Sequence, residues 1–150
     1  MEKNLKLIEK VSFQMLDFFK KEKREKIAVI YLQKKDEAIF GNKFVPFQEN
    51  SYISHSFKSV SLKTEALKKC IIYAIENHYD GLLLVHNHPA WIPFFSNSDI
   101  KTFKATIKHL QMYGYPLIHG IGVVTKERMG TRFDSIFVKS DFYKKIADYI

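Results

Sequence analysis

A short, continuous apolar run most constrains the fold: Leu-Leu-Leu-Val at positions 82–85, directly after Asp80 and Gly81. The Asp-Gly pair ends the helical pattern before it, and an apolar run without polar alternation is typical of a strand buried on both faces. Such a strand lies inside a sheet that carries helices on its two sides. The run therefore predicts a layered domain built around a central sheet.

Helical and strand patterns alternate along the rest of the 150 residues. Apolar residues at spacings of three and four predict helices over 4–21, 61–77, 97–113 and 141–149. Apolar, β-rich runs predict further strands over 27–32, 38–45, 117–124 and 133–138. Residues 46–60 combine loop signals with a short edge strand, and Ser61 is placed to cap the second helix. We expect one α/β (α+β) domain over residues 1–150, with a mixed central sheet flanked by helices.

Charge and cysteine content narrow the function classes. Cys70 is the single cysteine and lies in an apolar helical pattern, so we expect a small buried side chain rather than a nucleophile or metal ligand. The sequence shows neither a leader pattern nor an apolar stretch near the ~20 residues that span a bilayer, which favours a cytoplasmic protein. The net charge of +8 suits nucleic acid, an acidic membrane surface or an acidic protein, but a solvated, lysine-rich surface explains it as well.

The residues that carry chemistry are His86-Asn87-His88-Pro89, followed by Ser96 and Asp99. Two histidines at i and i+2 on a strand project to the same face, so both imidazoles can meet one ion at the end of the strand. Asp99, in the first turn of the next predicted helix, can return to that edge. Two imidazoles and one carboxylate, with a fourth position left for water, form a zinc site of the open, catalytic kind.

Each half of this pattern also has a purely structural explanation. Ser96 and Asp99 form a Ser-x-x-Asp sequence that caps a helix without any metal. A His-x-His pair after a strand is weak by itself. The joint pattern, with Pro89 fixing the turn in a strand-loop-helix context, favours metal binding.

The spacing His-x-His-x(7)-Ser-x(2)-Asp resembles the signature of the JAMM (MPN+, or JAB-domain) metalloproteases, which include deubiquitinating enzymes and their bacterial relatives. His-Asn-His-Pro, with Pro93 after it, is similar to the RadC-like bacterial branch. The resemblance covers most of the chain and implies a JAB/MPN-like (cytidine-deaminase-like) fold. The chain departs from the branch at Ala90 and Trp91, where Ser-Gly is usual, and at Phe95, where Pro precedes the serine. These changes keep the ligands and make the loop bulkier.

The same resemblance implies roles for two further residues. The family uses a glutamate at the start of the strand after the first helix, and Glu25 matches that position, with Glu22, Glu37 and Glu49 as rivals. Glu25 would take the proton of a zinc-activated water and pass it to the leaving amine. Ser96 would hydrogen-bond the oxyanion of the tetrahedral intermediate.

We therefore expect a zinc-dependent peptidase or isopeptidase acting on a peptide or the tail of a ubiquitin-like protein. Three apolar residues beside the motif, Trp91, Phe94 and Phe95, either grip an extended substrate or pack the loop on the domain. A RadC-like protein associated with DNA repair and binding nucleic acid weakly is one alternative. A scaffold that uses the fold only for partner binding is the other, and the intact ligand set argues against it.

Other candidate residues carry less weight. His119 matches a histidine of the RadC-like block, yet a satisfied histidine in the core or sheet is the simpler role. His55, His78 and His109 have no partner that the sequence identifies. Gly120-x-Gly122 lies in a predicted strand without a following helix, which argues against a nucleotide site.

Overall fold

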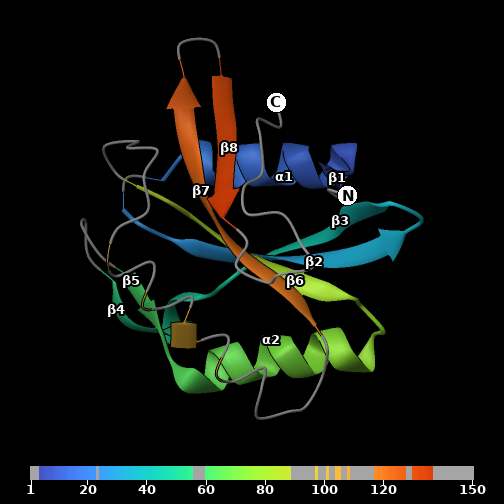
Figure 1. The fold of residues 1–150 in the computed structure, drawn as a ribbon. Helices are drawn as coiled ribbons and strands as arrows, with labels where there is room; N and C mark the ends of the chain where they lie inside the picture. The colour runs from blue at the N-terminus through green and yellow to red at the C-terminus, as the bar shows by residue number, and fades with distance from the viewer. Residues whose placement is uncertain are drawn as a thin grey trace.

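A mixed sheet of six strands forms the centre of the protein, in the order β1-β3-β2-β6-β7-β8, and β4 and β5 pair separately (Figure 1). The computed structural model describes residues 4–22, 24–55, 60–88, 117–127 and 130–136, together with 97, 101, 104, 105 and 108. Its strands are β1 Asn4–Leu7, β2 Ile27–Lys35, β3 Ala38–Pro46, β4 Tyr52–His55, β5 Val60–Leu62, β6 Gly81–Asn87, β7 Ile118–Glu127 and β8 Gly130–Ile136. Its helices are α1 Glu9–Lys20, α2 Thr64–Glu76 and a short 3-10 turn, η1 Glu49–Ser51.

Strand β6 is the buried centre of this sheet, as its apolar run predicts. All seven of its residues are buried, and the strand extends beyond 82–85 to include His86 and Asn87. It runs antiparallel to β2 and parallel to β7. The predicted α+β class with a mixed central sheet is thus confirmed.

The two helices cover opposite faces of the sheet, α1 on one side and α2 on the other (Figure 1). Successive residues of the inner strands alternate between the two cores, as the period of two in a strand requires. Leu83 and Val85 pack in the core that holds α1, whereas Leu82 and Leu84 pack in the core that holds α2. Both faces of the sheet are therefore covered by apolar side chains, so a polar side chain on β6 must be hydrogen-bonded or paired to offset the cost of its burial.

Strands β6 and β7 approach closely where β6 begins. Gly81 is paired with Ile118, and a Cβ atom at position 81 would lie 2.2 Å from the Ile118 carbonyl oxygen. Only glycine fits there. The close pairing sets the register that carries β6 toward its histidines at the other end.

The N-terminal segment corrects one prediction. Residues 4–7 form β1, which pairs in parallel with β3, and the helix begins only at Glu9, after Ile8 in an extended conformation. The side chain of Leu5 is buried in the core through this strand. The helical stripe itself is confirmed from Val11 onward, since Val11, Met15 and Phe19 are buried.

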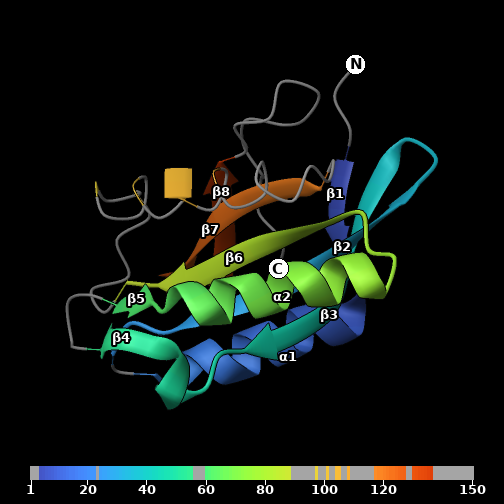
Figure 2. The same ribbon diagram turned by 90° about the horizontal axis from the view of Figure 1, so that it is seen from below.

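The second helix also starts later than predicted. Ser61 lies in β5, and Lys63 occupies the N-cap position of α2, without a side-chain cap hydrogen bond. The backbone N–H of Lys63 donates to the carbonyl of Ser51, which ties η1 to the helix start. The β4–β5 pair lies beside this end of α2, at the same end of the sheet as the tip of β6 (Figure 2).

The C-terminal third is described in part. The five described residues between 97 and 108 are helical, in agreement with the third predicted helix. The last predicted strand is observed as β8, earlier in the chain than 133–138, and the helix expected over 141–149 lies outside the described residues. Among the described residues no helix is both long and apolar enough to cross a membrane.

Candidate metal centre

The C-terminal end of β6 brings two imidazoles together. Nε2 of His86 lies 3.0 Å from Nε2 of His88, and the ring planes are inclined by 58°, so the two nitrogens converge without ring stacking. His86 is 7% exposed and the side chain of His88 12%. This geometry follows from the i, i+2 spacing at a strand end, as the sequence analysis expected.

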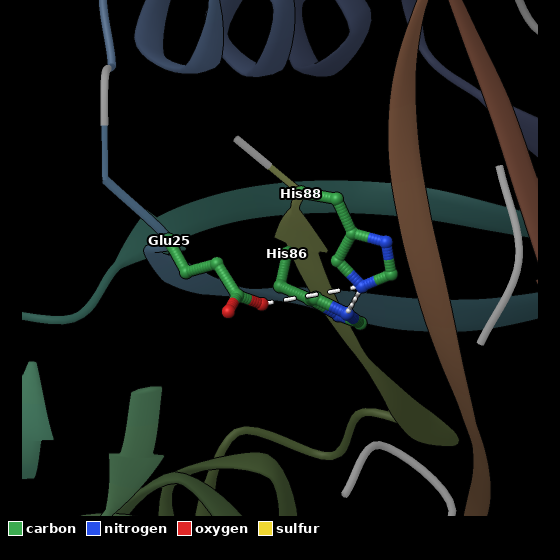
Figure 3. A group of neighbouring side chains, drawn as sticks. All are labelled: Glu25, His86 and His88. Atoms are coloured by element: carbon green, nitrogen blue, oxygen red, sulfur yellow. Dashed lines mark hydrogen bonds and ion pairs between the residues drawn. The ribbon is translucent and has the colours of Figure 1, made fainter. Parts of the chain in front are cut away.

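A buried carboxylate completes the group (Figure 3). Glu25 is only 6% exposed, and its Oε1 lies 4.0 Å from Nε2 of His88. One ligand atom from each of Glu25, His86 and His88 lies within 4.8 Å of the others. Residue 25 reaches this place because β2 runs antiparallel to β6 with Ile27 opposite His86, which sets the chain just before β2 against the tip of β6.

The donor set fits a metal ion. Two ligand atoms held at about 2.0–2.1 Å from a tetrahedral zinc ion lie about 3.3 Å apart, close to the 3.0 Å between the two imidazole nitrogens. The carboxylate oxygen is farther from His88, at 4.0 Å. Glu25, His86 and His88 therefore form a cluster that could hold a metal ion.

The rival glutamates lie in other environments. Glu22 forms an ion pair with Lys26, and Glu49 forms ion pairs with Arg24 and Lys26. Glu37 follows the positive-φ residue Asp36 in the turn between β2 and β3, at the far end of β2 from residue 25. Of the four glutamates, the structure brings Glu25 to the histidines.

Two polar side chains that the sequence analysis did not single out support this end of the sheet. Asn87, which stands between the two histidines in the sequence, is fully buried, accepts a hydrogen bond from the Lys26 N–H at 2.8 Å and donates one to the Arg24 carbonyl at 3.1 Å. The hydroxyl of Tyr52 accepts from the Ile27 N–H at 2.9 Å and donates to the Ile27 carbonyl at 3.3 Å. The only sequence signal for either was the place of Asn87 inside the motif.

Burial keeps two further side chains, the Tyr52 hydroxyl and the Cys70 thiol, protonated at neutral pH. Burial raises the pKa of the Tyr52 hydroxyl to about 12, with the carboxylates of Glu49 and Glu22 adding to the shift. Burial also raises the pKa of the Cys70 thiol to about 12, and this thiol contacts the Leu67 carbonyl at 3.1 Å. Cys70 is thus the small buried side chain that the sequence predicts.

The remaining predicted site residues lie outside the described part of the chain: Ser96, Asp99, Trp91, Phe94 and Phe95. His119 is buried in β7 and its Nδ1 lies 3.3 Å from the Leu117 carbonyl, which agrees with a histidine of the sheet. It is paired with Leu82, at the opposite end of β6 from His86.

Comparisons with known proteins support the fold and no more. No family model matches the sequence, and no curated protein matches it. The structure is similar to the solution structure of protein DSY2949 from Desulfitobacterium hafniense, with a TM-score of 0.61 over 97% of this chain and 90% of that chain. The two sequences are 14% identical, so the likeness shows a shared fold alone.

Proposed function

We propose that the protein is a zinc-dependent peptidase or isopeptidase of the JAMM type, with a JAB/MPN-like arrangement of the sheet and its helices. The observation that carries the proposal is the buried Glu25 carboxylate beside the two converging imidazoles of His86 and His88. A buried carboxylate beside two converging imidazoles is a combination typical of sites that hold an ion or exchange protons. Zinc is favoured because imidazole nitrogens are among its preferred ligands.

The roles divide between ligands and proton carrier. His86 and His88 would hold the ion with Asp99, which the motif spacing adds as third ligand. A zinc ion in such a three-ligand site lowers the pKa of its bound water toward ~7. Glu25 is proposed to take the proton of that nucleophile, because its Oε1 lies 4.0 Å from Nε2 of His88, farther than the ~3.3 Å between two ligand atoms of a tetrahedral zinc ion.

The rest of the reaction uses the same carboxylate and the predicted helix start. Once Glu25 has accepted a proton, it can protonate the leaving amine, which expels the amine from the tetrahedral intermediate. Ser96 is proposed to donate a hydrogen bond to the oxyanion of that intermediate. Trp91, Phe94 and Phe95 are proposed to line the approach of an extended substrate, a peptide or the tail of a ubiquitin-like protein.

The test is hydrolysis by the zinc-loaded protein. We would supply two probes, a library of internally quenched peptides and ubiquitin carrying a C-terminal aminocoumarin amide, with and without a strong chelator. Cleavage that the chelator abolishes and added zinc restores supports the proposal. A protein that binds zinc but cleaves neither probe contradicts the peptidase assignment, and one that cannot be loaded contradicts the metal site as well.

A further inference from the structure

The segment that carries Glu25 receives little support from regular structure. Residues 24–26 belong to neither a helix nor a strand, and the β2–β6 pairing begins only at Ile27, opposite His86. A glutamate in such a segment has many accessible backbone conformations unless its peptide groups are tied down. Something must fix this backbone if the carboxylate is to stay beside the histidines.

Asn87 supplies that tie. Its carboxamide accepts from the N–H of Lys26 and donates to the carbonyl of Arg24, so it binds the peptide groups on both sides of Glu25. A carboxamide offers the same donor and acceptor as a peptide group. The Asn87 side chain therefore continues the hydrogen bonding of the β2–β6 pair past its last backbone rung.

The Asn87 hydrogen bonds differ from the other contacts of this segment, because they hold its peptide groups from a fully buried side chain. Asn87 is 0% exposed, and the two backbone groups that it satisfies would lose their partners if its side chain were removed. Arg24 and Lys26 also pair with Glu49, whose side chain is 58% exposed, and exposed ion pairs contribute little. Lys26 pairs with Glu22 as well, at 3.2 Å and with less exposure, but this contact holds the Lys26 ammonium and not a peptide group beside Glu25. Removing the carboxamide leaves the Lys26 N–H and the Arg24 carbonyl without this partner at a part-buried place, where a shift of the segment or an entering water must replace it.

We infer that Asn87 is a positioning residue, which holds Glu25 against His86 and His88 through the peptide groups of residues 24 and 26. Its role in turnover rests on the proposed function, whereas its hold on the segment does not. Residues 86–88 thereby supply two imidazoles and the clamp, by which we mean the two hydrogen bonds of Asn87 that hold the segment of Glu25. Asn87, the middle residue of His86-Asn87-His88, thus positions Glu25 and has a role distinct from those of the two histidines.

The first test needs no metal and no substrate. In Asn87→Ala we expect the backbone amide of Lys26 to exchange with solvent at least ~100-fold faster than in the wild type, since its acceptor is gone. Asn77→Ala is the matched control, because Asn77 also donates to a backbone carbonyl, that of Tyr73, at the exposed end of α2. Unchanged protection of Lys26 in Asn87→Ala overturns the inference.

The second test asks whether Asn87 acts through Glu25. Zinc affinity would be measured by competition with a chelating dye for the wild type, Asn87→Ala, Glu25→Ala and the double variant. We expect each single variant to lose about 10–100-fold, as partners of ligand groups commonly do. The double variant should be within about 2-fold of Glu25→Ala, since nothing remains for Asn87 to position.

Two results of this cycle overturn the inference. If Asn87→Ala keeps the zinc affinity of the wild type, Asn87 is not needed to position Glu25. If Asn87→Ala lowers the zinc affinity by the same factor in the Glu25→Ala background as in the wild type, Asn87 acts on the histidines or on folding and not through Glu25. Asn87→Ser, whose hydroxyl still serves one backbone group, replaces the alanine variant if that one does not fold. A protein that never takes up zinc refutes the proposed function, while exchange at Lys26 still decides the clamp.

Discussion

The Glu25 carboxylate lies 4.0 Å from the His88 imidazole, although the two residues come from opposite sides of helix α2 in the sequence. The antiparallel pairing of β2 with β6 produces this contact. Under the proposed function, the carboxylate exchanges a proton with a group held between the two side chains, whereas the imidazoles hold the ion. This relationship separates the expected effects of changing the carboxylate from those of changing an imidazole.

Replacing Glu25 with glutamine should abolish turnover and leave the zinc in place. The amide keeps the size of the carboxylate and a hydrogen-bonding group, but it cannot accept a proton, so kcat on the peptide or ubiquitin probe should fall by ~10²–10⁴. Zinc content by elemental analysis should remain about one ion per chain at micromolar protein. Glu37→Gln, in the β2–β3 turn, is the control and should keep full activity. An active Glu25→Gln would transfer the role to another group.

Replacing His86 with alanine should remove metal and activity together. Only two protein ligands of the proposed three would remain, and a catalytic zinc site is built from three. After dialysis against zinc and then buffer, the wild type should retain about one ion per chain and gain thermal stability from it. His78→Asn, changed at a positive-φ turn position that asparagine tolerates, should match the wild type. Retention of a full zinc equivalent by His86→Ala would disprove its role as a ligand.

The sequence predicts the inner strands well and the N-terminus poorly, for a physical reason. The short apolar run of β6 is typical of a strand buried on both faces, and its flanking Asp-Gly pair sets the start. Residues 4–7 are ambiguous, because Leu5 fits both a helical stripe and the alternation of a strand. Pairing with β3 decides between them, and that partner lies 34 positions away along the chain at Ile39 (39 − 5).

The same contrast between local patterns and long-range pairing applies to the candidate site. The i, i+2 histidines on a strand end are a local pattern, so their convergence can be read from the sequence. The clamp of Asn87 cannot, because it depends on which backbone groups stand opposite residue 87. Only the register of β2 against β6, with Ile27 opposite His86, places Arg24 and Lys26 within reach of its carboxamide.

The thiol of Cys70 should be unreactive in the folded protein. Burial raises its pKa to about 12, so at neutral pH the nucleophilic thiolate is scarce and the sulfur is also covered. We expect no modification by iodoacetamide over hours in buffer and one label per chain in denaturant, counted by mass spectrometry. Rapid labelling of the native protein would mean that α2 opens readily.

Binding to DNA should be weak and independent of sequence. The net charge of +8 attracts phosphates, and Lys101, Lys104 and Lys108 are exposed at helical spacing, but no base-reading element lies beside them among the described residues. Affinity for a short duplex, followed by fluorescence anisotropy, should fall steeply as salt rises to physiological strength. Nanomolar binding that persists in that salt would instead favour the nucleic-acid alternative.

Alkaline pH should destabilise the protein in part through Tyr52. Its pKa is about 12 in the folded state and about 10 when the chain is unfolded, so above pH ~10 the unfolded state loses the proton first. Stability therefore falls as pH rises: the contribution of this hydroxyl is present in full below the unfolded pKa and is lost progressively up to the folded pKa. Between about pH 9 and pH 11 this group alone should remove about 1 kcal/mol of unfolding free energy.

Tyr52→Phe isolates that contribution. At neutral pH it should cost about 1–3 kcal/mol, since the buried N–H of Ile27 loses its acceptor. On going to alkaline pH, however, it should lose about 1 kcal/mol less than the wild type, because phenylalanine has no proton to release. Urea unfolding at a series of pH values, under reducing conditions, measures both effects. Parallel pH profiles for the two proteins would show that the Tyr52 hydroxyl titrates normally and that burial at the start of β2 does not hold its proton.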